Sequence, residues 1–74
     1  MYKTTDLYLA AFLRANEHKI RTTKREKSKV TFFFDDTDIL RNKVLDFFND
    51  GLVSVTKFKN AINDLKTIIY NVGV

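Results

Sequence analysis

Residues 19–34 read KIRTTKREKSKVTFFF and combine two patterns that together decide the fold. Val30, Phe32 and Phe34 alternate with their neighbours, which is typical of a strand with one face toward a core. The segment before them holds six of the thirteen Lys and Arg residues of the chain, opposed only by Glu26, so residues 19–34 carry a charge of +5. Because the whole chain carries +4, all other residues together carry −1. We therefore predict a β-hairpin that also concentrates the positive charge of the protein.

The turn of this hairpin has no glycine to mark it, so the pairing of its strands is inferred from their faces. A two-residue loop at residues 27–28 would place Arg21 and Arg25 on the buried side. A three-residue loop at residues 26–28 places Ile20 there instead, and we predict this longer loop. It pairs Lys24 with Val30, Thr22 with Phe32 and Ile20 with Phe34. The outward face then consists of Lys19, Arg21, Thr23, Arg25, Lys29, Thr31 and Phe33.

An unbroken apolar run, LYLAAFL at residues 7–13, precedes the hairpin and predicts a helix over about residues 5–15. Thr4 or Thr5 can cap this helix, and Asn16 can end it. Consecutive apolar residues cover every side of a helix, because each step turns about 100°. Such a helix is either enclosed between layers of the fold or covered by a second molecule.

A helix over about residues 37–49 follows the hairpin, with Asp36 or Thr37 as its cap and Gly51 as its stop signal. The spacing of its apolar residues places them in one stripe. These residues are Leu40, Val44, Phe47 and Phe48.

The clearest amphipathic pattern predicts a last helix over about residues 54–70, capped by Ser54. Its apolar side chains recur every three or four residues, at Phe58, Ala61, Ile62, Leu65, Ile68 and Ile69. A two-stranded hairpin is only marginally stable alone, so its apolar face must lie on helices. The predicted fold is therefore a single α+β domain over residues 1–74, in the order α-β-β-α-α, with an antiparallel hairpin packed on three helices.

Composition and motifs argue against several classes of protein. The chain contains no cysteine, which excludes disulfides, thiolate nucleophiles and cysteine-ligated zinc. Its apolar runs are shorter than the roughly 20 residues of a membrane helix, and its N-terminus lacks the pattern of a signal peptide, so we expect a cytoplasmic protein without membrane contact. His18 is the one histidine, and Asp35, Asp36 and Asp38 suit the N-terminal end of a helix better than a metal site. We therefore expect no catalytic residues, no metal site and no cofactor.

The basic hairpin is the candidate binding site. We predict that it holds a partner through Lys19, Arg21, Lys24, Arg25, Lys27 and Lys29, with Phe33 adding an apolar contact. Such a ribbon suits either an acidic protein surface or nucleic acid, and Phe33 could stack on the bases of a single strand. The alternative is that these charges only keep an edge of the sheet from pairing with other chains.

A second candidate surface lies on the predicted helix over residues 5–15. Tyr8 and Phe12 share one side of that helix, and both would be exposed if only the opposite side faced the core. Exposed aromatic residues mark interfaces, so this side is a candidate homodimer interface. If the helix is enclosed between the hairpin and the other helices, both residues belong to the core instead.

The opening of the chain resembles a family of small domains. The motif is Tyr2-x-Thr4-x-Asp6-Leu7-Tyr8-Leu9-Ala10-Ala11-Phe12-Leu13, and weaker matches follow in Phe32-x-Phe34 and in Ala61-x-x-x-Leu65-Lys66 with Tyr70. The family is uncharacterised and occurs in phages, prophages and mobile elements of Gram-positive bacteria. Its members often have Gly at the position of Glu17. The resemblance implies a phage or mobile-element origin, and it transfers no activity and no functional residue.

These observations together predict a non-enzymatic accessory binding protein of a phage or mobile element. We expect it to act on a host or phage macromolecule through the basic hairpin, for example as an inhibitor. Two alternatives remain open. One is direct binding of DNA or RNA through the same ribbon, and the other is a structural homo-oligomer in which the charges only keep the particle soluble.

Overall fold

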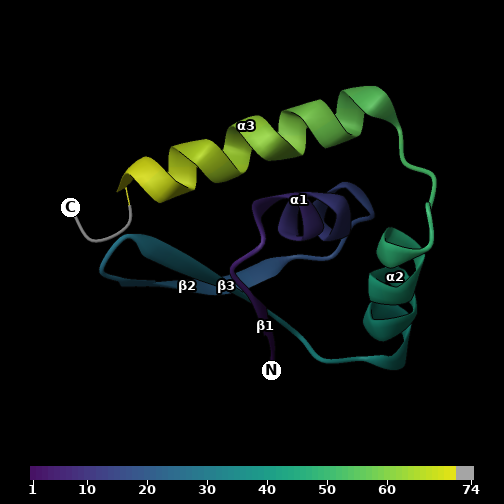
Figure 1. Ribbon diagram of the computed structural model, residues 1–74, viewed down its shortest axis with the longest axis horizontal. Coiled ribbons are helices and arrows are strands. Elements are labelled where there is room, and N and C mark those ends of the chain that lie inside the picture. Colours follow the sequence, from purple (N-terminus) through teal and green to yellow (C-terminus); the bar gives the residue numbers. More distant parts are fainter. Residues whose placement is uncertain (72–74) are drawn as a thin grey trace.

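The structure is a computed structural model in which residues 1–71 are described. These residues form three strands and three helices: β1 (Tyr2–Thr4), α1 (Leu7–Ala15), β2 (Ile20–Glu26), β3 (Lys29–Phe34), α2 (Asp38–Phe48) and α3 (Val55–Asn71). The strands form one antiparallel sheet in the order β1-β3-β2. Figure 1 shows α1 between the sheet and α3, with α2 beside α1 at one end of the molecule. The predicted α+β class, the hairpin and the helices are confirmed, and β1 is an element that the prediction lacked.

The core is built around the middle of α1, where consecutive residues are buried on every side of the helix. Every residue from 9 to 13 is buried, as expected for a helix between layers. Side chains from the other elements pack on α1. They come from the sheet (Val30, Phe32 and Phe34), from α3 (Ala61 and Leu65) and from α2 (Leu40). Phe12 also contacts Phe47 of α2, with ring centroids 5.5 Å apart. The apolar run at the start of the chain is thus explained by packing inside one molecule.

The hairpin loop has two residues, Lys27 and Ser28, and not the three predicted. The predicted register is therefore wrong near the loop. Toward the base of the hairpin, Ile20 does lie opposite Phe34 as predicted, because an irregularity between Ile20 and Thr22 absorbs one residue. The remaining pairs are Glu26–Lys29, Arg25–Val30, Lys24–Thr31, Thr23–Phe32 and Thr22–Phe33.

Two backbone features make the short loop possible. Lys27 has a φ of 56°, in the left-handed region, at the position where two-residue type II′ turns prefer glycine. The bulge at Arg21 then removes this residue from the position opposite Phe34, where it would have faced the core. Lys27 thus occupies the first position of the turn, at which glycine is more common.

The N-cap of α1 is Asp6, and not Thr4 or Thr5 as predicted. The Asp6 Oδ1 atom accepts hydrogen bonds from the backbone N–H groups of Tyr8 at 2.9 Å and Leu9 at 3.2 Å. Thr4 supports this cap indirectly, because its hydroxyl accepts a hydrogen bond from the N–H of Asp6 at 3.1 Å. Aspartate is as good an N-cap as threonine and adds a charge that favours the positive end of the helix dipole.

α2 and α3 begin at predicted caps. The Thr37 hydroxyl accepts from the N–H of Leu40 at 3.1 Å, and the Ser54 hydroxyl accepts from the N–H of Lys57 at 3.3 Å. α2 ends near the predicted Gly51, whose N–H donates to the Asp46 carbonyl at 2.6 Å. A Cβ atom at Gly51 would lie 2.7 Å from that same oxygen, so the approach requires glycine.

The acidic residues before α2 are ion-paired. Asp36 accepts two hydrogen bonds from Arg41, each 2.7 Å long, and these bonds lower the pKa of Asp36 below its ordinary value. The Arg41 guanidinium also lies 5.8 Å from the centre of the Tyr2 ring. Asp36 therefore does not cap α2, and its partner Arg41 links the start of α2 to β1.

α1 ends in a hydrogen-bond pattern that normally includes glycine. The His18 N–H donates to the Leu13 carbonyl and the Glu17 N–H donates to the Arg14 carbonyl, both at 3.0 Å, which is a Schellman motif. Asn16 is the C-cap of α1, as predicted, and the residue in the left-handed conformation is the next one, Glu17, with φ of 71°. Glu17 is also the position at which the resemblance of the sequence leads one to expect Gly.

Replacing Glu17 with Gly is expected to raise the free energy of unfolding by about 0.5–1 kcal/mol. The left-handed conformation costs an L residue roughly 1–2 kcal/mol, and the greater freedom of glycine in the unfolded chain offsets part of that gain. Urea unfolding followed by circular dichroism would measure the change. Glu17→Ala is the matched control, because it also removes the exposed 3.7 Å pair with Lys57 but keeps the Cβ atom. A Gly variant no more stable than the Ala variant would contradict the argument.

Candidate functional site

The candidate site is the face of the sheet that points away from α1 and α3. In Figure 1 both helices lie on the same side of the sheet, so none of the described helices covers the other side. The pairing of the strands decides which residues share this second side, because cross-strand partners point the same way. We call it the open face, and its members are Lys3, Thr22, Lys24, Glu26, Lys29, Thr31 and Phe33.

Phe33 lies at the centre of the open face. It belongs to the central strand β3, and its direct neighbours are Lys3 on β1 and Thr22 on β2. Its side chain is half-buried, whereas Phe32 and Phe34 on the opposite face are fully buried. A depression of about 540 Å³ lies over this region and is lined by Lys3, Thr4, Thr5, Lys24, Glu26, Thr31 and Phe33.

The charge of the open face is positive. Lys3, Lys24 and Lys29 oppose Glu26, and each of these four residues is exposed. The Lys24 ammonium lies 3.2 Å from the Glu26 carboxylate, with about two-thirds of both side chains exposed. Water screens such a pair strongly, so Lys24 can exchange Glu26 for another anion at little cost.

The two arginines predicted for the outward side are both engaged within the molecule. Arg25 lies opposite Val30 on the helix side of the sheet, so its predicted outward position is wrong. Its guanidinium donates a 2.7 Å hydrogen bond to the carbonyl of Ile69, near the C-terminal end of α3. A cation there also complements the negative end of the helix dipole. Arg25 thus joins the hairpin to α3.

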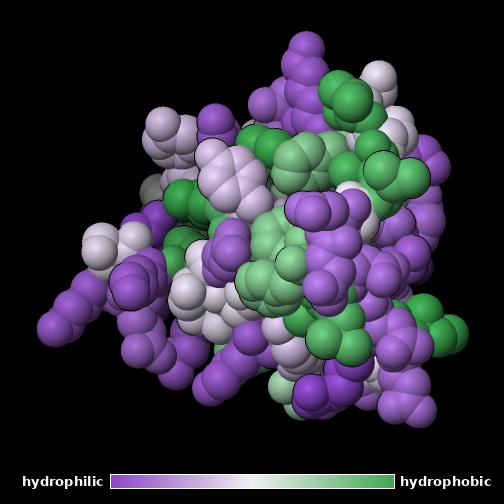
Figure 2. Space-filling view, turned by 45° about the vertical axis from the view of Figure 1, so that its right-hand side comes forward, coloured by the Kyte–Doolittle hydropathy of each residue, from purple (hydrophilic) through white to green (hydrophobic). Residues whose placement is uncertain are grey.

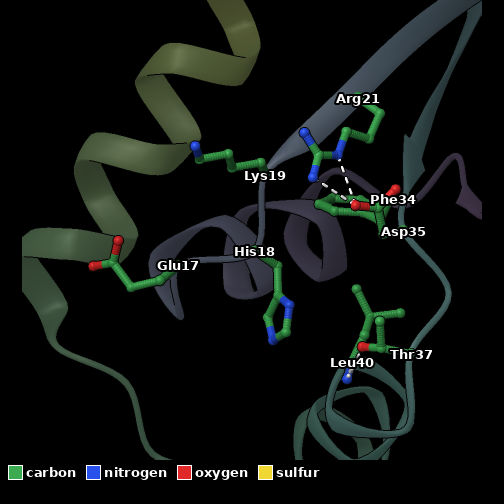
Figure 3. A pocket seen from close by; sticks show the side chains of 8 residues that line it. All are labelled: Glu17, His18, Lys19, Arg21, Phe34, Asp35, Thr37 and Leu40. Atoms are coloured by element: carbon green, nitrogen blue, oxygen red, sulfur yellow. Dashed lines mark hydrogen bonds and ion pairs between the residues drawn. The ribbon is translucent and has the colours of Figure 1, made fainter.

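Arg21 is exposed but paired with Asp35. Its Nε donates a 2.8 Å hydrogen bond to an Asp35 carboxylate oxygen, and its NH2 group lies 2.6 Å from the same atom. Figure 3 shows the two side chains facing each other. Both line a hollow of about 300 Å³ at the base of the hairpin. Lys19 and His18 also line this hollow, so Lys19 lies outside the open face. The paired carboxylate balances the charge of Arg21.

The other predicted residues are divided between the surface and the core. Lys27 is exposed in the hairpin loop, next to the end of the open face. Tyr8 is 58% exposed and remains a candidate interface residue. Phe12 is only 3% exposed and packs on Phe47, so it is not available to a second molecule.

Sequence reasoning missed Lys3 and Glu26 as members of the site. Lys3 joins the open face only because β1 pairs with β3, opposite Phe33. The signal in the sequence was the alternation Tyr2-Lys3-Thr4, which is short but has strand-forming residues on both sides of the lysine. Glu26 was assigned to the loop, whereas it is the last residue of β2.

A second surface feature is apolar. Large exposed side chains occur at the end of α2 and along its connection to α3, and we call this group the apolar corner: Leu45, Phe48, Leu52 and Val55. Figure 2, in which the right-hand side of Figure 1 comes forward, shows apolar groups in green interrupted by polar ones in purple. The apolar corner belongs to α2, to the start of α3 and to their connection, whereas the open face belongs to the sheet.

Two further structural findings concern ligands and membranes. Within residues 1–71, no three His, Asp or Glu side chains come together as a group that could hold a metal ion. Among the helices of the same residues, none has the length and apolar character needed to cross a membrane.

Comparison with known proteins assigns the chain to a family. No curated protein and no solved structure matches it. One family model does match, and its description is a domain of unknown function, DUF5659. The match covers residues 1–71, which include every strand of the sheet and all three described helices. The chain therefore belongs to the DUF5659 family of domains of unknown function.

Proposed function

We propose that this protein is a non-enzymatic accessory binding protein of a phage or mobile element, and that it holds an acidic macromolecule on its open face. The observation that carries the proposal is that Lys3, Lys24 and Lys29 share one uncovered face of the sheet with a half-buried Phe33. A charged edge strand is enough to prevent aggregation, but protection against aggregation does not need an aromatic ring at the centre of a sheet face. The combination supports a binding surface.

The groups on the open face are suited to binding and not to catalysis. The lysines and threonines of this face can hold anions through charge and hydrogen bonds, and Phe33 can hold an apolar or aromatic group. The carboxylate on this face, Glu26, is already beside Lys24. Docking would proceed by attraction of an acidic surface to the lysines, followed by contact with Phe33. Such a small protein could inhibit a host enzyme by covering an acidic region of it.

The proposal is tested by affinity capture from host lysate with charge-reversed variants. Lys24→Glu combined with Lys29→Glu reverses two charges on the open face. Lys59→Glu combined with Lys66→Glu is the matched control, because both lysines are exposed on α3 and the net charge changes equally. We expect the wild type and the control to capture the same species. The amount captured by the open-face variant should be at least about tenfold lower, because each lost ion pair with a partner contributes on the order of 1 kcal/mol.

Lysate with and without nuclease treatment forms the second arm of this experiment. A species that disappears with nuclease is a nucleic acid or is held through one, and a species that persists is a protein. Retention of the same species by the open-face variant would show that the partner docks elsewhere and would overturn the proposal.

A further inference from the structure

We infer that the macromolecule held on the open face is a single-stranded nucleic acid, with one base stacked on Phe33 and neighbouring phosphates on Lys3, Lys24 and Lys29. The inference rests on the proposed function and names its partner. It starts from three observations: the position of the ring, the shape of the surface around it, and the distribution of charge on both sides of it.

The position of Phe33 favours unpaired bases over a duplex. The ring lies at the centre of a sheet face and not at the tip of a protruding ribbon. The opposite side of the ribbon packs on the helices, with Val30 buried in the core and Arg25 bonded to α3, so the hairpin cannot enter a major groove with both faces. The bases of a duplex are stacked on one another, and only an extruded or single-stranded base can meet a ring on such a face.

The shape of the surface favours one planar group over a protein. The depression over Phe33 has a volume of about 540 Å³, within the range of small-molecule sites. Among the described residues of the open face, Phe33 is the one large apolar side chain. A stable protein interface buries about 800 Å² on each partner around an apolar centre. One ring surrounded by Lys and Thr provides little of such a centre, but it is enough for a base.

The lysines of the open face lie where they can contact the phosphates of a single-stranded nucleic acid that crosses the sheet. Lys3 and Lys24 are on the two edge strands, β1 and β2, with β3 between them. Lys3 pairs with Phe33 and Lys24 pairs with Thr31, so two inter-strand spacings and an offset of two residues separate the lysines. Their Cα atoms therefore lie roughly 12 Å apart, on a diagonal that passes Phe33. A nucleic-acid backbone that runs over β3 would thus have a lysine ammonium group on each side of the stacked base.

Glu26 adds a preference among bases. It lines the same depression as Phe33, and its carboxylate can only accept hydrogen bonds. Carboxylates accept from the exocyclic amino group of cytosine, whereas thymine presents a carbonyl oxygen at the equivalent position. The open face should therefore bind oligodeoxycytidine more tightly than oligothymidine, and Glu26→Ala should remove this preference.

Fluorescence anisotropy with short labelled oligonucleotides tests the inference. The probes are oligodeoxycytidine, oligothymidine and a duplex of equal length, each titrated at several salt concentrations. We expect the single strands to bind at least about tenfold more tightly than the duplex. Three phosphate contacts give a slope of log affinity against log salt of roughly −2, and Lys24→Ala with Lys29→Ala should reduce its magnitude by roughly 1.4.

The decisive variant is Phe33→Leu. We expect about a tenfold loss of affinity for single strands with the salt slope unchanged, because stacking is lost while the phosphate contacts remain. Phe48→Leu is the control for an exposed aromatic ring, and Lys59→Ala with Lys66→Ala is the control for charge; neither should change the affinity. Phe33→Trp, which keeps a stacking ring of larger area, covers the case in which leucine weakens the fold, and it should retain the wild-type affinity.

Two outcomes overturn the inference. One is duplex that binds as tightly as single strands, and the other is a Phe33→Leu variant that binds single strands as the wild type does, with the loss of affinity confined to the lysine variants. If the oligonucleotides fail but a nuclease-resistant species is still captured through Lys24 and Lys29, the partner is a protein and the proposed function stands. If both measurements fail, the open face is not a binding site and the two conclusions fall together.

Discussion

Replacing Phe32 with Ala is expected to lower the free energy of unfolding by about 3–5 kcal/mol. Phe32 is among the largest fully buried side chains, and it lies between the sheet and α1 at the centre of the core. At roughly 0.05–0.15 kcal/mol per residue, the whole domain is stabilised by only about 4–11 kcal/mol. The variant should therefore lose a large part of its stability, and a fraction of it should be unfolded at room temperature.

Phe33→Ala is the matched control, since it removes the same ring from the next position of the same strand. Phe33 lies on the open face and is half-buried, so we expect its removal to cost about 1 kcal/mol or less. Because the chain contains no tryptophan, urea unfolding followed by far-ultraviolet circular dichroism is the suitable measurement. Equal losses for the two variants would mean that both rings are in the core, and the assignment of the open face would be wrong.

The alternation of Val30, Phe32 and Phe34 was sufficient to predict the core face of β3, because period-two alternation is a property of one strand alone. For the same reason Phe33 was placed correctly on the opposite side. The loop was not predictable by the same reasoning. Its length depends on the left-handed backbone of Lys27 and on the bulge at Arg21, and neither residue type indicates such a conformation.

The candidate site shows how one misplaced residue changes a surface. Since side chains alternate with period two, the extra loop residue in the predicted register exchanged the faces of Lys24 and Arg25. Lys24 is on the open face and Arg25 bonds to α3, the reverse of the predicted pairing. Lys3 was missed for a different reason: the alternation of a three-residue strand is too short to predict a strand, and its pairing with β3 is a contact between residues about thirty positions apart.

The second large effect concerns the interface between α1 and α3. Leu65→Ala is expected to lower the free energy of unfolding by about 2–5 kcal/mol, because the Leu65 side chain is 0% exposed and truncation leaves a cavity against α1. The same truncation at Leu52, which is 93% exposed, should change stability by less than about 0.5 kcal/mol. Thermal and urea unfolding of the two variants, side by side, measure this contrast.

The Leu52 result also distinguishes a monomer from the homo-oligomer alternative. Leu52 belongs to the apolar corner, which is exposed in the single chain. If a second copy covered this corner in solution, Leu52 would be buried there, and its truncation would destabilise the protein. The melting temperature would then rise with protein concentration in the wild type and depend on concentration less in the variant.

We expect instead that Leu52→Ala is neutral and that the melting temperature of both proteins is independent of concentration. Combined with loss of binding in the open-face variants, that result would assign the function of the chain to the sheet and not to self-association. A concentration-dependent melting temperature lost in Leu52→Ala would reverse this assignment.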